Sequence, residues 1–350
     1  MIINPNGFLL PSGSGLVFWN FEEHRQFELT GKHLQRLIEL AENINNYCAD
    51  HPLDQDFCNT NILIDKPSLT PTWGWDELSR LFHLGTRDIP YEDTPTDEAT
   101  WTAAYLQHCS DALKQPFPTE TFEAMAPASV HLEKPDANYT ELPLLTTRAT
   151  SRVFSRNPVS LDLLSEILFY TLGFIDERAL PESTCLPISL RQRRCSPSGG
   201  GLNSTEGYLY AKNIEGLDAG LYFYNPAHHA LHSCTHQLPD LGELLSGQHF
   251  INTLPFGIFL ASRFDKLWWK YKHSRAYRMA LIEVGHISQT FQLAATHFGL
   301  KTWLTGAIDE RAVESLINPK NPAAQILFFV GAGHGENEPA PRKLSNLINT

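Results

Sequence analysis

The densest group of potentially reactive side chains lies in the stretch LWWKYKHSRAYRM, which starts at residue 267. Lys270 stands beside Tyr271 and is followed by Arg275 and Arg278. Like charges and shielding by an indole ring would disfavour the lysine ammonium, so Lys270 could act as a base near neutral pH. The same cations would favour a Tyr271 phenolate, which leaves both residues as candidate bases. An exposed basic turn before a helix is the alternative interpretation.

A second candidate is the glycine-rich loop CSPSGGGLNSTEG, which starts at residue 195. Three consecutive glycines before a strand let the backbone come close to a flat or phosphorylated ligand. The loop lacks the dinucleotide-binding fingerprint, because no strand leads directly into it and no long helix is expected to follow it. A Rossmann-type site is therefore not expected, and a flexible surface turn is the alternative.

A third candidate is the segment RATSR, in which Arg148, Thr150 and Arg152 alternate. In an extended chain the three side chains would face the same way. Two guanidinium groups and a hydroxyl suit a phosphate group. A solvated strand edge is the alternative interpretation.

A histidine-rich run, AHHALHSCTHQ, resembles a set of zinc ligands because His232, Cys234 and His236 would share one face of a strand. Side chains at strand spacing stand in a line about 7 Å apart and do not converge on one ion. The run is therefore interpreted as a surface hairpin, and no metal site is predicted.

Several elements are expected to position these residues. A helix is predicted from Leu161, with Ser160 as its N-cap and Gly173 at its end. A long apolar helix is predicted over 276–298. The segments FGIFLAS and QILFFVG predict buried strands, and EGYLYAKNIEGLDAGLYFYN predicts two further strands.

The chain length of 350 residues favours two domains. A small α+β domain is predicted over 1–115, with strands followed by a helix that starts near Lys32. Five prolines between 116 and 143 predict a linker. The second domain is predicted over 144–350.

The composition excludes some partners. With 27 basic and 39 acidic residues the net charge is -12, which disfavours binding to nucleic acid or to anionic membranes. The sequence shows neither a signal-peptide pattern nor an apolar run long enough to cross a membrane, so a cytoplasmic location is expected. The six cysteines form no dense framework and are expected to be reduced thiols.

Taken in order, these segments resemble the nitroreductase-like flavoproteins, and within them the SagB-type dehydrogenases that form thiazoles and oxazoles in ribosomally made peptides. The resemblance covers about residues 145–345. The Lys270-Tyr271 pair, RAYR at 275–278 and GH at 285–286 point to the SagB-type branch. A looser likeness extends to WGWDELSRLFHLGTR at 73–87.

The resemblance implies an α+β fold of the nitroreductase type, in which helices flank a central, mostly antiparallel sheet that binds FMN, preceded by a smaller α+β domain. Lys270 and Tyr271 match the family's pair near the substrate, and Trp269, Arg275 and Tyr277 are expected to line the substrate pocket. The positions that match the family's FMN contacts are Arg148, Thr150, Arg152, Pro197, Ser198, Gly199, Gly200, Thr305, Gly306, Arg342 and Lys343.

The implied activity is an FMN-dependent removal of two hydrogens from a thiazoline or oxazoline in a precursor peptide. The implied partners are that peptide and the subunits of a cyclodehydratase, and the implied assembly is a homodimer. Two other functions stay open: an NAD(P)H-dependent reductase of nitro compounds or quinones, and a structural subunit that holds a cyclodehydratase together.

Overall fold

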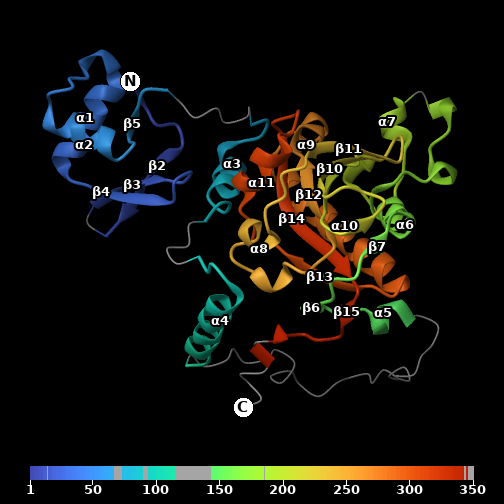
Figure 1. The fold of residues 1–350 in the computed structure, drawn as a ribbon. Helices are drawn as coiled ribbons and strands as arrows, with labels where there is room; N and C mark the ends of the chain where they lie inside the picture. The colour runs from blue at the N-terminus through green and yellow to red at the C-terminus, as the bar shows by residue number, and fades with distance from the viewer. Residues whose placement is uncertain are drawn as a thin grey trace, which may run out of the picture. The chain divides into compact units, whose positions relative to one another are not determined.

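The computed structural model describes residues 1–13, 15–66, 73–89, 94–114, 143–184, 186–342 and 344–345. Its internal contacts divide the chain into two compact units. The first unit comprises Met1–Glu92 together with Trp268–Arg278, and the second comprises Asp93–Leu267 together with Met279–Thr350. Each unit is described separately below (Figure 1).

The second unit is built on a six-stranded antiparallel sheet in the order β11-β10-β8-β12-β14-β13. The strands are β8 (Thr205–Ala211), β10 (Gly220–Asn225), β11 (Ala230–Thr235), β12 (Phe256–Arg263), β13 (Lys301–Thr305) and β14 (Ala324–Gly333). The predicted sheet type is confirmed, and the two apolar segments predicted as buried strands form the adjacent inner strands β12 and β14.

Both faces of this sheet are covered, so its central strands carry long apolar runs. On one face Leu209 and Ile258 pack against helices α6 (Leu161–Leu172) and α10 (Tyr277–His297). On the other face Tyr208 and Phe259 pack in a second core with α8 (Leu241–Leu244) and α11 (Glu310–Ile317). Successive strand residues point to opposite faces. The uninterrupted apolar runs in the sequence therefore follow from burial on both sides.

The helix ends follow the predicted local chemistry. The Ser160 hydroxyl accepts a hydrogen bond from the Leu163 backbone N–H at 3.3 Å and caps α6. After α10, Gly299 takes a φ of +78°, a left-handed conformation that suits glycine. These caps fix the length of the two helices that cover one face of the sheet.

The described part of the second unit contains further elements. They are α4 (Glu98–Leu113), α5 (Pro143–Thr147), β6 (Val153–Phe154), β7 (Val159–Ser160), η3 (Asp176–Arg178), η4 (Glu182–Thr184), α7 (Ile188–Arg191), η5 (Gly199–Gly201), β9 (Ile214–Glu215), η6 (His249–Ile251) and β15 (Gly335–Glu336). Helix α9 (Phe264–Lys270) begins in the second unit, and its last residues belong to the first.

The first unit contains a three-stranded antiparallel sheet of β2 (Gly7–Ser12), β3 (Gly15–Asn20) and β4 (Arg25–Leu29). It also contains α1 (Gly31–Glu42), η1 (Ile44–Asn46), α2 (Pro52–Asn59), α3 (Glu77–Leu84), η7 (Ser274–Ala276) and the short pair β1 (Ile2–Ile3) and β5 (Leu63–Ile64). A small core joins the sheet to α1 and α2 through Phe18, Leu29, Leu37, Leu40, Phe57, Ile62 and Leu63. The smaller α+β region that was predicted is present.

The two units differ from the predicted linear division in two places. Helix α4 clusters with the second unit, where the Trp101 ring lies 4.7 Å from that of Phe250. Residues 268–278 cluster with the first unit, although the chain on either side of them belongs to the second. The predicted linker over 116–143 lies outside the described residues except for Pro143, so that boundary stays a prediction.

A buried ion pair ties α1 to α2 in the first unit. The Arg36 guanidinium donates to both carboxylate oxygens of Asp54, at 2.7 Å each, and Asp54 is fully buried. The Arg36 hydrogen bond, together with a backbone N–H of Cys48, holds the pKa of Asp54 below its usual value. Because the carboxylate is buried, its charge depends on these donors.

We expect Arg36→Ala to lower the free energy of unfolding of the first unit by about 3–5 kcal/mol, because it leaves the Asp54 carboxylate buried without its cation. Hydrogen exchange of the amides in α1 and α2 in the full chain measures this change. The loss should shrink in acid: the lowered pKa means that the pair stabilises the fold above about pH 4, and that this stabilisation disappears as the pH falls through the lowered value.

Arg25→Ala is the matched control. Arg25 lies in the same unit, is exposed and approaches Glu23 at 4.0 Å, so its removal should change the free energy by less than about 0.5 kcal/mol. Equal effects of the two variants would contradict the prediction.

Candidate active site

The glycine-rich loop connects α7 to β8 and adopts a backbone that other residues rarely take. Gly200 and Gly201 have φ values of +66° and +68°, and Asn203 also lies in the left-handed region at +47°. A Cβ on Gly201 would come within 3.1 Å of the Arg193 guanidinium. The left-handed backbone therefore favours glycine at both 200 and 201, and at 201 the space is also tight.

The loop is fixed to α10 by a buried carboxylate, Glu283, whose residue is 2% exposed. The Ser198 hydroxyl donates to one carboxylate oxygen of Glu283 at 2.6 Å. The backbone N–H of Thr205 donates to the other oxygen at 2.9 Å, and the Thr205 hydroxyl also donates to it at 3.1 Å. Glu283 thus holds the middle and the end of the loop against one helix.

Sequence reasoning missed Glu283, although a signal was present. Glu283 is a charged residue four positions before Ile287 and eight before Phe291, on the apolar face of the predicted helix. A carboxylate in that position is costly to bury unless donors surround it. The structure supplies the donors from the glycine-rich loop and from the start of β8.

A pocket of about 420 Å³ opens beside this loop. Its lining includes three arginines, and it consists of Arg178, Arg193, Arg194, Cys195, Ser196, Pro197, Ser198, Gly201 and Asn203. A volume of this size is in the range of small-molecule and cofactor sites. The guanidinium groups favour a ligand that carries negative charge or carbonyl oxygens.

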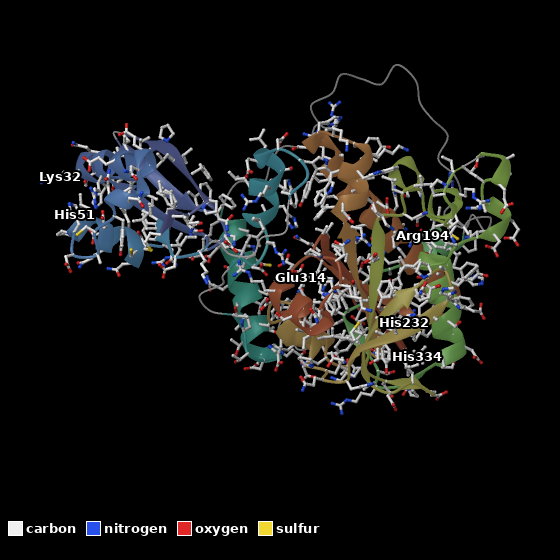
Figure 2. The ribbon with its side chains drawn as sticks, turned by 90° about the horizontal axis from the view of Figure 1, so that it is seen from above. Lys32, His51, Arg194, His232, Glu314 and His334 are labelled. Atoms are coloured by element: carbon white, nitrogen blue, oxygen red, sulfur yellow. The ribbon has the colours of Figure 1, made fainter. Side chains whose placement is uncertain are left out.

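Arg194, labelled in Figure 2, is the most buried of the three arginines. Burial lowers the pKa of its guanidinium to about 10, and the Glu283 carboxylate opposes this shift, so the group stays charged at neutral pH. One of its terminal nitrogens donates to the Thr205 carbonyl at 2.7 Å. Its Nε–H is buried and has no hydrogen-bond partner among the described residues, so a donor remains for a ligand acceptor.

These features fit a flavin. The glycines of the loop, called the glycine cradle below, allow close approach of a flat ring. The buried Arg194 cation, whose Nε–H has no partner among the described residues, suits the carbonyl and nitrogen acceptors at the pyrimidine edge of a flavin ring. Lys266 adds a further donor nearby, with its ammonium 3.1 Å from the Asn203 carbonyl oxygen. Burial lowers the pKa of Lys266, which was also not singled out from the sequence.

Arg148 and Thr150 lie together beside α10. The Arg148 guanidinium is 3.5 Å from the Thr150 hydroxyl and 3.3 Å from the side-chain oxygen of Gln292. The Arg152 guanidinium donates instead to the carbonyl oxygen of Pro339. Two members of the predicted phosphate-binding set are therefore in contact, while the third reaches the C-terminal segment.

Thr305 ends β13, where its hydroxyl accepts from the Ala307 backbone N–H at 3.0 Å and from the Gln248 amide at 3.2 Å. Gly306 follows it. Arg342 is exposed and pairs with Glu336 at 2.5 Å, and Lys343 lies outside the described residues. The flavin contacts of these four positions stay predictions.

The predicted catalytic pair belongs to the first unit. The Lys270 ammonium lies 5.7 Å from the centre of the Tyr271 ring. Trp269 is 60% exposed and Arg275 is exposed, whereas Tyr277 is buried and its hydroxyl lies 3.0 Å from the Nδ1 atom of His83. Trp268 packs against Trp73 and Trp75. The predicted site residues are thus divided between the two units.

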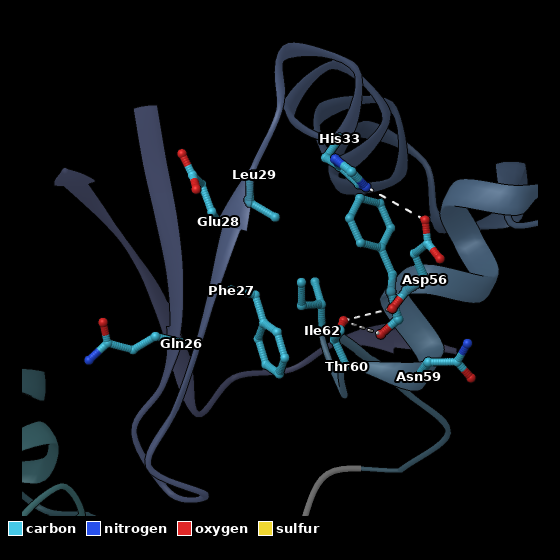
Figure 3. Close-up of a pocket in the computed structure, with 10 residues that line it drawn as sticks. Gln26, Phe27, Glu28, Leu29, His33, Asp56, Asn59, Thr60 and Ile62 are labelled. Atoms are coloured by element: carbon cyan, nitrogen blue, oxygen red, sulfur yellow. Dashed lines mark hydrogen bonds and ion pairs between the residues drawn. The ribbon is translucent and has the colours of Figure 1, made fainter. Parts of the chain in front are cut away.

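A second pocket, of about 380 Å³, lies in the first unit between β4 and α2 (Figure 3). Phe27, Leu29 and Ile62 form its apolar part, and the His33 ring nitrogen is 3.6 Å from an Asp56 carboxylate oxygen. None of the residues that line it belongs to the predicted site.

The histidine-rich run forms β11 and the turn before it, and His232 is exposed on this edge strand (Figure 2). Within the described part of the chain, no cluster of three or more His, Cys, Asp or Glu side chains could hold a metal ion. Among the described helices, none is long and apolar enough to span a membrane. The described cysteines Cys48, Cys58, Cys109, Cys195 and Cys234 form no disulfide.

Comparison with known proteins places this arrangement in a family. Residues 145–334 match the model of the nitroreductase family. The trifolitoxin-processing protein TfxB of Rhizobium leguminosarum bv. trifolii is 30% identical over 182 residues, which cover 50% of this chain and 48% of that protein. The microcin B17-processing protein McbC of Escherichia coli is 33% identical over 164 residues, which cover 44% of this chain and 60% of McbC.

A chain of the solved E. coli microcin synthetase McbBCD complex with truncated pro-MccB17 bound is also similar, with 21% identity and a TM-score of 0.44. The match covers 67% of this chain and 94% of that one. The aligned regions span about half of TfxB and three fifths of McbC. The resemblance inferred from the sequence is confirmed by the family match, which covers more than half of the chain: this protein belongs to the nitroreductase family.

Proposed function

We propose that this protein is an FMN-dependent dehydrogenase of the SagB type, which oxidises thiazolines or oxazolines to thiazoles or oxazoles in a ribosomally made precursor peptide. The observation that carries the proposal is the glycine cradle that Glu283 fixes beside the arginine-lined pocket, inside the region that matches the family. The names of two relatives, which process trifolitoxin and microcin B17, support a role in peptide maturation.

In the proposed cofactor site, Pro197, Ser198, Gly199 and Gly200 would lie along the flavin ring, with Arg194 as a donor to its oxygen and nitrogen acceptors. Arg148, Thr150 and Arg152, together with Thr305, Gly306, Arg342 and Lys343, complete the proposed contacts that the resemblance assigns. Charged donors and backbone amides of this kind hold phosphate groups.

The proposed reaction removes one proton and one hydride from the azoline ring. The ring C–H next to the peptide carbonyl is weakly acidic, so Lys270 or Tyr271 would take this hydrogen as a proton. Bound FMN would supply the oxidant that accepts the hydride from the neighbouring carbon. Trp269, Arg275 and Tyr277 are the proposed neighbours of the substrate ring. The aromatic product makes the oxidation favourable.

Partners follow from the same proposal. A precursor peptide would be the substrate, cyclodehydratase subunits would supply the azoline, and the chain would act as a homodimer in the cytoplasm. A reductase that uses NAD(P)H on nitro compounds or quinones is the second candidate, and the description of the matched family favours it.

The first test compares two electron donors. The purified protein should be yellow, and an azoline-containing peptide added without oxygen should bleach the flavin absorbance, because the peptide is the proposed hydride donor. NADPH should bleach it little. Rapid bleaching by NADPH with no effect of the peptide would support the reductase, and a protein unable to take up FMN would contradict both functions.

The second test concerns the base. The double variant Lys270→Ala, Tyr271→Phe should lose at least about a hundredfold in peptide dehydrogenation, because it removes both candidate proton acceptors, while its FMN content stays at the wild-type level. Lys272→Ala is the matched control and should retain activity. If the double variant kept full activity, while deletion of the whole subunit abolished processing, the scaffold function would be favoured.

The third test concerns the cradle. Glu283→Ala should reduce the fraction of purified protein that carries FMN, since Ser198 and Thr205 lose their acceptor and Arg194 loses an opposing charge. The expected destabilisation is about 1–3 kcal/mol. Glu283→Gln should retain more FMN, because an amide oxygen can still accept from Thr205. The ratio of flavin absorbance to protein absorbance measures the FMN content of each variant. Glu243→Ala, which removes an exposed carboxylate, serves as the control.

A further inference from the structure

The segment that carries Lys270 and Tyr271 contacts residues 73–83, which lead into and form most of α3, at regular intervals. Contacts are made at Trp268, Tyr271, Ser274 and Tyr277, which are spaced by three residues. Between them, Trp269, Lys270, Lys272 and Arg275 are exposed. One side of the segment is therefore bound within the first unit, and the other side presents the cationic residues.

The first contact is a hydrogen bond to the backbone of the Lys270-Tyr271 pair itself. The indole N–H of Trp75 donates to the carbonyl oxygen of Tyr271 at 2.8 Å. Trp75 is 8% exposed, and a buried indole N–H needs an acceptor. The bond therefore fixes the main chain directly after Lys270.

The second contact is made by Ser274, three residues after Tyr271. The Ser274 hydroxyl contacts the Asp76 carboxylate and lies 2.9 Å from the Ser79 hydroxyl. This contact lowers the pKa of Asp76, whose carboxylate also caps α3 by accepting from the Leu78 backbone N–H at 3.1 Å. The same side chain thus determines where α3 begins and where Ser274 lies.

Aromatic packing holds the start of the segment. The Trp268 ring lies 5.7 Å from each of the Trp73 and Trp75 rings, and it meets Trp75 edge to face. A Cβ on Gly74 would come within 2.4 Å of the Trp268 ring, so this approach requires glycine between the two tryptophans. At the far end, the Tyr277 hydroxyl is held by His83 at 3.0 Å.

We propose that Trp75 and Asp76 are positioning residues for the Lys270-Tyr271 pair, so that the first unit takes part in catalysis by fixing the geometry of the base. This inference rests on the proposed azoline dehydrogenase function. Proton transfer depends on the distance between base and substrate, and a displacement of about 1 Å can lower a rate about a hundredfold. Neither residue is assigned a contact with the substrate.

Trp75→Phe tests the proposal, because it keeps an aromatic ring and removes the N–H that binds the Tyr271 carbonyl. We expect kcat for an azoline peptide to fall at least about tenfold, with KM and FMN content unchanged. Amides of residues 269–276 should also exchange faster with solvent. Trp19→Phe is the matched control: Trp19 is half-buried in β3 of the same unit and packs against Phe8, so this variant should keep wild-type values.

Ser274→Ala is a second, milder variant, which removes the contact with Asp76 and should also lower kcat and speed exchange. The proposal is overturned if both variants keep wild-type kcat, or if the loss in Trp75→Phe is matched by Trp19→Phe or explained by lost FMN. Amide exchange requires no substrate, so unchanged exchange in 269–276 also overturns it. A wild-type protein without azoline turnover would instead overturn the proposed function.

Discussion

The glycine-rich loop and its pocket in the second unit depend on a buried carboxylate on the apolar face of α10. Glu283 lies among residues that pack on the sheet, where a charge is costly unless it is surrounded by donors. The donors come from Ser198 and Thr205, and the buried Arg194 supplies the opposing charge. The helix, the glycine-rich loop and the first residue of β8 are therefore fixed together, and the shape of the pocket follows from this set of bonds.

The sheet beneath the loop explains why α10 can hold a carboxylate rigidly. Residues of β8, β12 and β14 pack on both faces, and α10 covers one face through Val284, Ile287 and Phe291. Interiors of this density leave little room for a helix to shift. The packing of α10 on the sheet thus fixes the position of Glu283. The hydrogen bonds of Glu283 in turn restrict the motion of the loop.

Elements with a strong local pattern could be predicted from the sequence. Strands β12 and β14, the Ser160 cap and the long helix up to Gly299 follow from apolar periodicity and turn residues within a few positions, whereas the sheet type follows from the resemblance. The bond from Trp75 to Tyr271 joins residues 196 positions apart, and no local pattern encodes such a pair. The same holds for the hydrogen bond between Tyr277 and His83, which are 194 positions apart. Site positions taken from the resemblance, such as Arg152 and Thr305, stay predictions.

The residues proposed for redox chemistry and for proton transfer are stabilised by separate sets of contacts. The cradle depends on Glu283 and Arg194 in the second unit, whereas Lys270 and Tyr271 depend on Trp75 and Asp76 in the first. Energetic effects of changes at sites that share no partner are usually additive. Flavin retention and proton transfer should therefore respond independently to substitution.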